Sequence, residues 1–241
     1  MSGHSRGRGL ARRSLAEFLG TGLLVTIVVG SGIAAQRLSA DTGLQLLENA
    51  LATAMGLGVL IVLLAPVSGA HFNPVVTLVI AILERRAHDR MRLREIAAYI
   101  PAQIAGGIGG AILANLMFAV PTALSTTDRA TPATFLAEVV ATAGLVLVIT
   151  GLIRTHQSIT VIATAVGSYI GAAYWFTSST SFANPAVTIG RMFTDTFAGV
   201  AHASVVPFIA AQILGGAVAA GLTIALFPRR SAVVPRARTG P

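Results

Sequence analysis

Six long apolar stretches, spaced along almost the whole chain, constrain its fold more than any other feature. They lie near residues 15–36, 44–66, 95–118, 133–153, 159–177 and 204–227. A helix needs about 20 apolar residues to cross the hydrocarbon core of a bilayer, so each stretch can form one spanning helix. Only 11% of the residues are charged, which leaves little for an aqueous domain. The sequence therefore predicts an all-α, multi-pass membrane protein whose function lies within the bilayer.

Two further apolar segments, 73–83 and 184–194, are too short to cross a membrane. At a rise of about 1.5 Å per residue, each reaches only about 16 Å. Both open with an Asn-Pro pair, Asn73-Pro74 and Asn184-Pro185. Asparagine is a good helix N-cap, and proline fits the first helical turn because its missing N–H is not needed there. We expect each pair to start a re-entrant half-helix.

The chain contains an internal repeat. Residues 16–25 recur at 137–146, residues 71–77 at 182–188, and residues 102–107 at 211–216, in the same order. Each unit holds three spanning stretches, so the second copy must be inverted relative to the first, and inverted repeats place a site near the bilayer midplane.

The inversion makes the N-termini of the two half-helices face each other. Their positive dipole ends disfavour cations and protons. Asn73 and Asn184 can each donate an amide N–H to a passing oxygen atom without ionising it. This arrangement favours a passive pore for uncharged solutes.

All 17 basic residues are arginines, and their distribution predicts the topology. Fourteen lie in the N-terminal tail 1–14, the connections 84–94 and 154–158, and the C-terminal tail 228–241. The opposite side holds only Arg37, Arg129 and Arg191. The excess places both termini in the cytoplasm, with the first repeat at 15–118, an extracellular loop at 119–132 and the second repeat at 133–227. The arginine clusters suit anionic lipid headgroups of a bacterial-type inner membrane rather than nucleic acid.

The sequence offers no basis for catalysis or for a cofactor. It has no cysteine, which excludes disulfides, thiolate metal sites and cysteine nucleophiles. No histidine pair has the spacing of metal ligands, and the spans assemble no Ser, His and Asp group. We expect neither an enzyme nor a metal or cofactor site.

These features resemble the aquaporin and aquaglyceroporin family, also called major intrinsic proteins. The resemblance rests on the Ala-Glu opening of each half, on residues 68–74 and Asn184-Pro185-Ala186, and on the two Gln-containing glycine-rich helices. It covers nearly the whole chain. It implies an aquaporin-like right-handed bundle of six spanning helices and two half-helices, and a homotetramer with one pore in each protomer.

The chain departs from the family pattern at two positions. The first box reads Asn73-Pro74-Val75, where the family usually has alanine, and the added methyl groups are expected to shift the half-helices only mildly. Water-selective members carry arginine directly after the second Asn-Pro-Ala, whereas this chain has Val187. The absence of this arginine removes a positive charge, several hydrogen-bond donors and a bulky side chain that narrows the pore. We therefore expect a wider and less polar pore. Arg191, one helical turn further on, is a candidate to replace the charge at another depth.

Two alignments of the remaining filter positions stay open. Counting from the two asparagines without gaps gives a filter of Thr53, Ala172, Ser181 and Val187. Aligning the helix glycines instead replaces the first two by Met55 and Tyr174. The first alternative has no aromatic wall, and Tyr174 would restore one.

Three ionisable residues have two interpretations each. Glu17 and Glu138 occupy equivalent positions within spans, where an ionisable group is costly. They are either a proton relay or, as the resemblance also implies, carboxylates that brace the loop before each half-helix. His71 either lines the vestibule as a pH gate or is a hydrogen-bonded structural residue.

The main functional hypothesis is a passive channel for small uncharged solutes that excludes ions and protons. The candidate solutes are polyols such as glycerol, neutral metalloid hydroxides such as arsenous acid, and water. The alternative is a proton-coupled secondary transporter that uses Glu17 and Glu138. The expected partners are the lipid bilayer, the neutral solutes and further copies of the chain.

Overall fold

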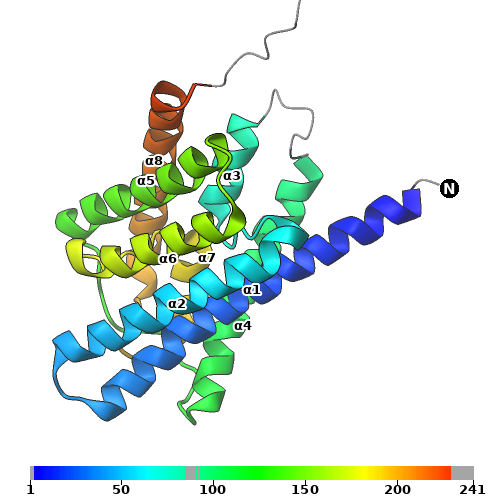
Figure 1. Cartoon of the computed structure of the whole chain (residues 1–241). Helices are drawn as coiled ribbons and strands as arrows, with labels where there is room; N and C mark the ends of the chain where they lie inside the picture. The colour runs from blue at the N-terminus through cyan, green and yellow to red at the C-terminus, as the bar shows by residue number, and fades with distance from the viewer. Residues whose placement is uncertain (1–2, 85–90, 92, 229–241) are drawn as a thin grey trace, which may run out of the picture.

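The computed structural model describes residues 3–84, 91 and 93–228, and in this part of the chain all regular structure is helical. The elements are α1 (Gly3–Leu38), α2 (Thr42–Ser68), α3 (Pro74–Leu83), α4 (Leu93–Met117), α5 (Pro132–Arg154), α6 (Ile159–Phe176), α7 (Pro185–Gly190), the 3-10 turn η1 (Arg191–Phe193) and α8 (His202–Leu226) (Figure 1).

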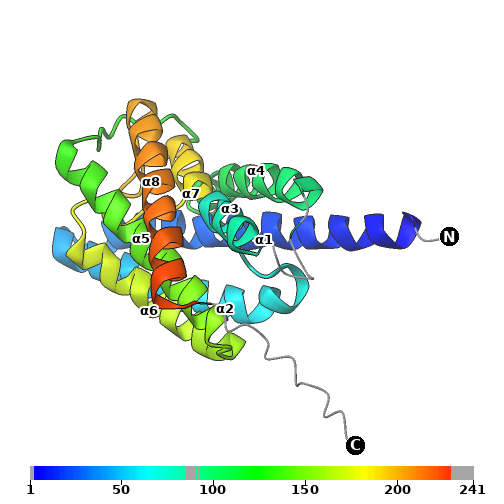
Figure 2. The same ribbon diagram turned by 90° about the horizontal axis from the view of Figure 1, so that it is seen from above.

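The six predicted spanning helices are confirmed. Helices α1, α2, α4, α5, α6 and α8 are long and apolar enough to cross a membrane. Apart from the start of α1, their ends agree with the apolar stretches within about two residues, because bilayer thickness fixes the length of each run. Helix α1 begins already at Gly3, so most of the predicted tail 1–14 is helical, and its N-terminal end projects beyond the bundle (Figures 1 and 2). The predicted tail 228–241 lies almost entirely outside the described residues.

Local capping explains where several helices begin. The Asp41 side chain accepts a hydrogen bond from the amide of Leu44 at the start of α2. Thr131 and Thr134 form a reciprocal capping box at the start of α5, and Pro132 occupies its first turn. Such caps satisfy amide groups that have no partner within the helix.

The bundle consists of two equivalent halves. Helix α1 packs against α2 and α4, and α5 packs in the same way against α6 and α8, while α2 and α6 join the halves. Helices α1 and α5 run in opposite directions (Figure 1), as the inverted repeat requires. The short helices α3 and α7 lie between α4 and α8 and contact both of them (Figure 2).

Glycines allow the half-helices to approach their neighbours closely. A Cβ atom on Gly107 of α4 would lie 2.5 Å from the carbonyl oxygen of Ala186 in α7. A Cβ atom on Gly216 of α8 would collide with the side chain of Val75 in α3. The branched Val75 therefore packs into the space left by a glycine.

A pore candidate between the two halves

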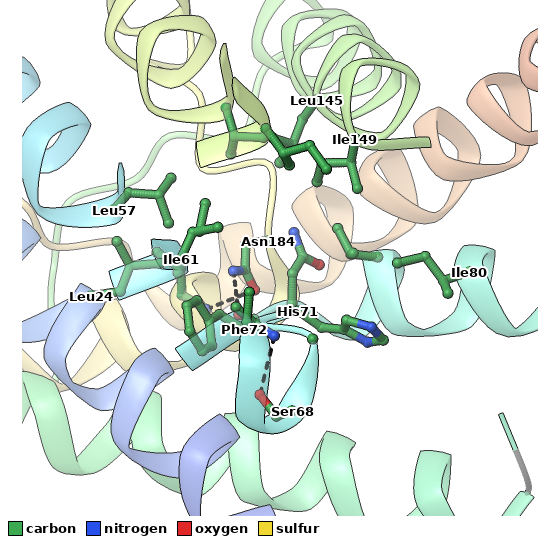
Figure 3. A pocket seen from close by; sticks show the side chains of 18 of the residues that line it. Leu24, Leu57, Ile61, Ser68, His71, Phe72, Ile80, Leu145, Ile149 and Asn184 are labelled. Carbon is green, nitrogen blue, oxygen red and sulfur yellow. Dashed lines mark hydrogen bonds between the residues drawn. The ribbon is translucent and has the colours of Figure 1, made fainter. Parts of the chain in front are cut away.

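A cavity of about 1120 Å³ extends between the two halves, from the N-terminal part of α1 past both Asn-Pro boxes to Arg191. One part of its wall is apolar, and Figure 3 shows Leu57 and Ile61 of α2 across from Leu145 and Ile149 of α5. The two re-entrant loops, 68–73 and 181–184, supply the polar part. The cavity therefore presents an apolar side and a hydrogen-bonding side to any solute within it.

The two asparagines cap their half-helices and brace each other's loops. The Asn73 side-chain oxygen accepts from the amide of Val75 at 2.9 Å, and the Asn184 oxygen accepts from the amide of Ala186 at 2.9 Å. Asn73 Nδ2 donates to the Ala183 carbonyl at 2.8 Å. Asn184 Nδ2 donates to the Phe72 carbonyl, also at 2.8 Å (Figure 3). A carboxamide nitrogen has two donor hydrogens, so each asparagine keeps one for a solute.

Both re-entrant loops contain left-handed backbone conformations at equivalent positions. Ala70 and Phe72 have φ near +50°, and Ser181 and Ala183 have φ of +54° and +49°. Such conformations cost non-glycine residues about 1–3 kcal/mol each. They persist only if the surrounding contacts hold them, and the two buried glutamates supply these contacts.

Each buried carboxylate accepts four hydrogen bonds. Glu17 receives them from the Ser68 hydroxyl, the amides of His71 and Phe72, and the Gln103 side chain, at 2.7–3.0 Å. Glu138 receives them from the Ser179 hydroxyl, the amides of Phe182 and Ala183, and the Gln212 side chain, at 2.6–2.9 Å. Neither carboxylate is among the described residues that line the cavity. These contacts agree with the bracing interpretation rather than with a proton relay.

Gln103 and Gln212 contribute to the site, although the sequence analysis assigned them no role. Each also donates to a threonine in a half-helix, Gln103 to Thr77 at 3.0 Å and Gln212 to Thr188 at 2.9 Å. The third repeat match already placed a polar side chain at the same position of two apolar helices. The equivalent positions of the two glutamines in the repeat could have identified them as part of the site.

The lining of the cavity includes residues from both alignments. Thr53, Tyr174, Ser181, Val187 and Arg191 line one end of the cavity, and the hydroxyls of Thr53 and Tyr174 lie 3.1 Å apart.

Met55 and Ala172 do not reach the cavity. The Met55 side chain is 65% exposed, and Ala172 is also exposed on its helix. Residues two positions apart on an α-helix point about 200° apart, so only one of Thr53 and Met55, and one of Ala172 and Tyr174, can face inward. The residue that faces the cavity is the one from the gap-free alignment in α2, Thr53, and the one from the shifted alignment in α6, Tyr174.

Arg191 brings a guanidinium group to this end of the cavity. The side chain is 2% exposed, its Nε donates to the Ala198 carbonyl, and its guanidinium carbon lies 3.5 Å from the centre of the Phe182 ring. Arg129 approaches the same ring at 5.7 Å. The cavity therefore has a positive charge near Val187 although position 187 itself is apolar.

The connecting loop 119–131 holds η1 and the segment that follows it. The Ser125 amide donates to the Met192 carbonyl at 2.8 Å, and Arg129 donates to the carbonyls of Phe197 and Gly199 at 2.8 and 2.7 Å. Hydrogen bonds from the Ser204 hydroxyl and the Ala130 amide lower the pKa of Asp128 in this loop. This loop thereby fixes the backbone carbonyl to which Arg191 is bound.

The other end of the cavity contains a polar network around His71. Arg13 pairs with Glu95 at 2.9 Å and donates to the Tyr99 hydroxyl at 2.8 Å. Tyr99 in turn donates to the Ser68 carbonyl at 2.8 Å, and its ring meets that of His71 edge to face. His71 lines the cavity and its Nδ1 lies 3.1 Å from the Thr77 hydroxyl. It therefore occupies the predicted vestibule position and is also hydrogen-bonded.

Comparisons with known proteins agree with this architecture. Residues 5–180 match the model of the family described as "Major intrinsic protein". The chain is 50% identical to aquaglyceroporin AqpS of Rhizobium meliloti (strain 1021) over 214 residues, which cover 88% of this chain and 89% of that protein.

Two further comparisons extend this similarity. The chain is 38% identical over 104 residues to the glycerol uptake facilitator protein of Escherichia coli (strain K12), a match that covers 43% of this chain and 34% of that protein. Its fold is similar to the X-ray structure of the aquaglyceroporin from Plasmodium falciparum, with a TM-score of 0.70 and 20% identity over 89% of this chain and 95% of that one. The chain therefore belongs to the major intrinsic protein family, whose members are membrane channels for small neutral solutes and not enzymes.

Proposed function

We propose that the chain is a facilitative channel for small polyols such as glycerol and for neutral metalloid hydroxides such as arsenous acid, with water as a further solute. The observation that carries this proposal is Val187, a buried aliphatic side chain at the filter end of the cavity. A valine is shorter than arginine and donates no hydrogen bond, so it leaves room for solutes larger than water.

The two-sided wall of the cavity suits a polyol. A polyol carries hydroxyls along one side and C–H groups along the other. Leu57 and Leu145 provide apolar contact, while Asn73 and Asn184 offer amide donors. Sites of this kind select solutes by diameter and by the hydrogen-bonding groups in the lining.

The same wall disfavours ions. The first amides of α3 and α7 are directed toward the Asn-Pro boxes, where their positive dipole ends oppose cations. Arg191 adds a positive charge at the filter end. The apolar wall gives an ion nothing to replace its hydration shell, so protons and metal cations are excluded.

The names of the relatives support polyols as solutes. The matched relatives include the glycerol uptake facilitator of Escherichia coli and a propanediol uptake facilitator of Citrobacter freundii, 34% identical over 109 residues that cover 45% of this chain and 38% of that protein. These two matches span only about a third of each relative. Glycerol and arsenous acid are both small, neutral and rich in hydroxyls, so one filter can admit both.

The assembly and orientation of the channel follow the sequence predictions. We propose a homotetramer with one pore in each protomer. Both termini lie in the cytoplasm, because the connection 84–94, with five arginines, and the connection 154–158, with Arg154, belong to the same side as the N-terminal tail.

Stopped-flow light scattering of proteoliposomes tests the solute assignment. Vesicles that contain the tetramer are mixed with glycerol, arsenous acid or a salt at equal osmolarity. We expect both neutral solutes to equilibrate faster than in protein-free vesicles, without accumulation above equilibrium, and the salt to stay excluded. A folded tetramer that passes neither neutral solute would refute the proposal.

A further inference from the structure

The filter end of the cavity contains hydrogen-bond donors without acceptors. Arg191 lines the cavity, and among the described residues its Nη1 and Nη2 groups donate no hydrogen bond, since only Nε is bound, to the Ala198 carbonyl. Ser181 also lines the cavity, and its buried hydroxyl has no partner in the described part of the chain. A buried polar group without a partner costs about 1–3 kcal/mol. The Ser181 hydroxyl is such a group, and a bound molecule that supplies acceptors to it would also pair the Nη1 and Nη2 groups of Arg191.

The charge around these donors is positive. Within the described ranges, Arg191 makes no ion pair, and Arg129 places a second guanidinium on the same Phe182 ring.

The acidic groups of this region are already bound elsewhere. Glu138 accepts four hydrogen bonds, including one from Gln212 at 2.6 Å. The Asp195 carboxylate accepts from the amide and the hydroxyl of Thr126, and Asp128 accepts from the Ser204 hydroxyl. The missing acceptor is therefore expected to be an anion from solution.

The geometry of Arg191 selects the shape of this anion. The guanidinium carbon lies 3.5 Å from the centre of the Phe182 ring, and the bond from Nε to the Ala198 carbonyl leaves the edge formed by Nη1 and Nη2. This edge matches the two oxygens of a carboxylate, which can accept two parallel hydrogen bonds. The hydroxyl of Ser181 can donate a third. Tyr174, whose hydroxyl already lies 3.1 Å from that of Thr53, closes the same end of the cavity.

We propose that Arg191 and Ser181 form a binding site for a small monovalent carboxylate, such as formate or acetate, and that its occupancy blocks the passage of neutral solutes. The anion stays at the filter end because the apolar wall beyond it, including Leu57 and Leu145, offers no compensation for its lost hydration. This inference rests on the proposed function, since flux of a neutral solute reports the block.

Inhibition of glycerol flux by formate tests the site. Proteoliposomes are equilibrated at neutral pH with equal sodium formate inside and outside, so that no formate gradient contributes, and are compared with vesicles in sodium chloride. We expect saturable slowing of glycerol entry by formate and none by chloride. Arg191→Lys keeps the positive charge but lacks the two parallel N–H donors of Nη1 and Nη2. It should raise the half-inhibitory formate concentration about tenfold. Arg191→Gln should abolish inhibition, and Ser181→Ala should weaken it several-fold.

Arg37→Gln is the matched control. Arg37 is an exposed arginine at the end of α1 that donates to the Phe118 carbonyl and does not line the cavity. This variant should keep both glycerol flux and its inhibition. Glycerol flux in the wild type that formate slows no more than chloride does would overturn the inference.

Thermal unfolding gives a readout that does not depend on flux. Formate should raise the unfolding temperature of the wild type and of Arg37→Gln, raise that of Ser181→Ala by less at the same concentration, and leave that of Arg191→Gln unchanged. If the wild type passes no neutral solute, the proposed function fails while this measurement still decides the anion site. Equal shifts in the wild type and in a folded Ser181→Ala variant would count against the site.

Discussion

At the scale of single residues, Val187 and Arg191 occupy the same end of the cavity, one turn apart on the segment formed by α7 and η1. We propose that the aliphatic residue keeps the passage open and that the arginine supplies a charge beside it. In this proposal the two side chains divide between them the steric and electrostatic roles that one filter arginine would combine.

The first prediction concerns Val187→Arg. The added guanidinium would share the filter end with Arg191, which narrows the passage and adds repulsion between like charges. An added barrier of about 1.4 kcal/mol lowers a rate about tenfold, so we expect glycerol permeability to fall by at least this factor. Water permeability should fall much less, because water is smaller. Stopped-flow measurements of both solutes on one preparation check the ratio, and equal losses would contradict the assignment of Val187 to the filter.

The second prediction concerns Glu138→Gln. An amide offers one oxygen and places an NH2 group among four donors, so at least two hydrogen bonds are lost around the second re-entrant loop. We expect a loss of about 3 kcal/mol in the free energy of unfolding, seen as a lower unfolding temperature in detergent. Glu17→Gln should behave alike because its contacts are equivalent.

The matched control for this prediction is Glu48→Gln. Glu48 lies in α2 and is partly exposed, so its substitution should leave the unfolding temperature nearly unchanged. If Glu138→Gln were as stable as the wild type and lost only a proton-dependent flux, the bracing role would be wrong.

At the scale of helices and half-helices, the sequence predicts the elements well and the filter register poorly. Each spanning helix is a run of apolar residues whose length matches the thickness of the bilayer, and each half-helix begins at an Asn-Pro pair. The inward face of α2 or α6 depends on how the chain leaves that helix and enters the loop. A shift of two residues turns a side chain by about 200°, which is the difference between Ala172 and Tyr174.

The contacts that a side chain makes are harder to predict from the sequence than the helix on which it lies. The repeat marked Glu17 and Glu138 as equivalent, yet the left-handed residues of the loops that they hold follow no glycine pattern. The stacking of Arg191 on Phe182 joins residues on two sides of the second box and depends on the loop 119–131. Such contacts arise from tertiary packing and leave no local signal in the sequence.

The third prediction concerns the contact between α3 and α8. Gly216→Ala would push against Val75 and should cost about 1–3 kcal/mol through overpacking. Val75→Ala should cost a similar amount through the cavity that it leaves. The double variant should recover part of both losses, with a coupling energy of about 1 kcal/mol, because the new methyl fills the vacated space. The measurement is a double-mutant cycle: the unfolding temperatures of the wild type, the two single variants and the double variant give the coupling energy.

Gly109→Ala is the control for the cycle. A Cβ atom at Gly109 would meet nothing within 4 Å in the described part of the chain, so the same substitution should be tolerated on the outer face of α4. Strictly additive effects of Val75→Ala and Gly216→Ala would show that the two residues do not compete for the same space.

At the scale of the whole molecule, we propose that the inverted repeat and the arginine distribution together determine how the channel is oriented. The repeat alone is compatible with either orientation, because inversion exchanges the two faces of the bundle. In the proposed orientation the arginines break this symmetry, since Arg37, Arg129 and Arg191 are the three that lie on the side opposite the termini. Two of these three are held by backbone carbonyls near the filter, so they carry a structural role in addition to their charge.

The fourth prediction is the orientation itself. Retaining arginine-rich segments in the cytoplasm fixes the direction of insertion, so a fluorescent protein fused after residue 241 should fluoresce, because it folds on that side. Alkaline phosphatase inserted in the loop 119–131 should be active, since it requires export, and the same enzyme inserted in 155–157 should be inactive. Protein levels measured for each fusion control for expression. Suppose that alkaline phosphatase inserted in 155–157 is active and the fluorescent protein after residue 241 does not fluoresce. The channel would then have the opposite orientation, with Arg191 at the cytoplasmic end of the pore.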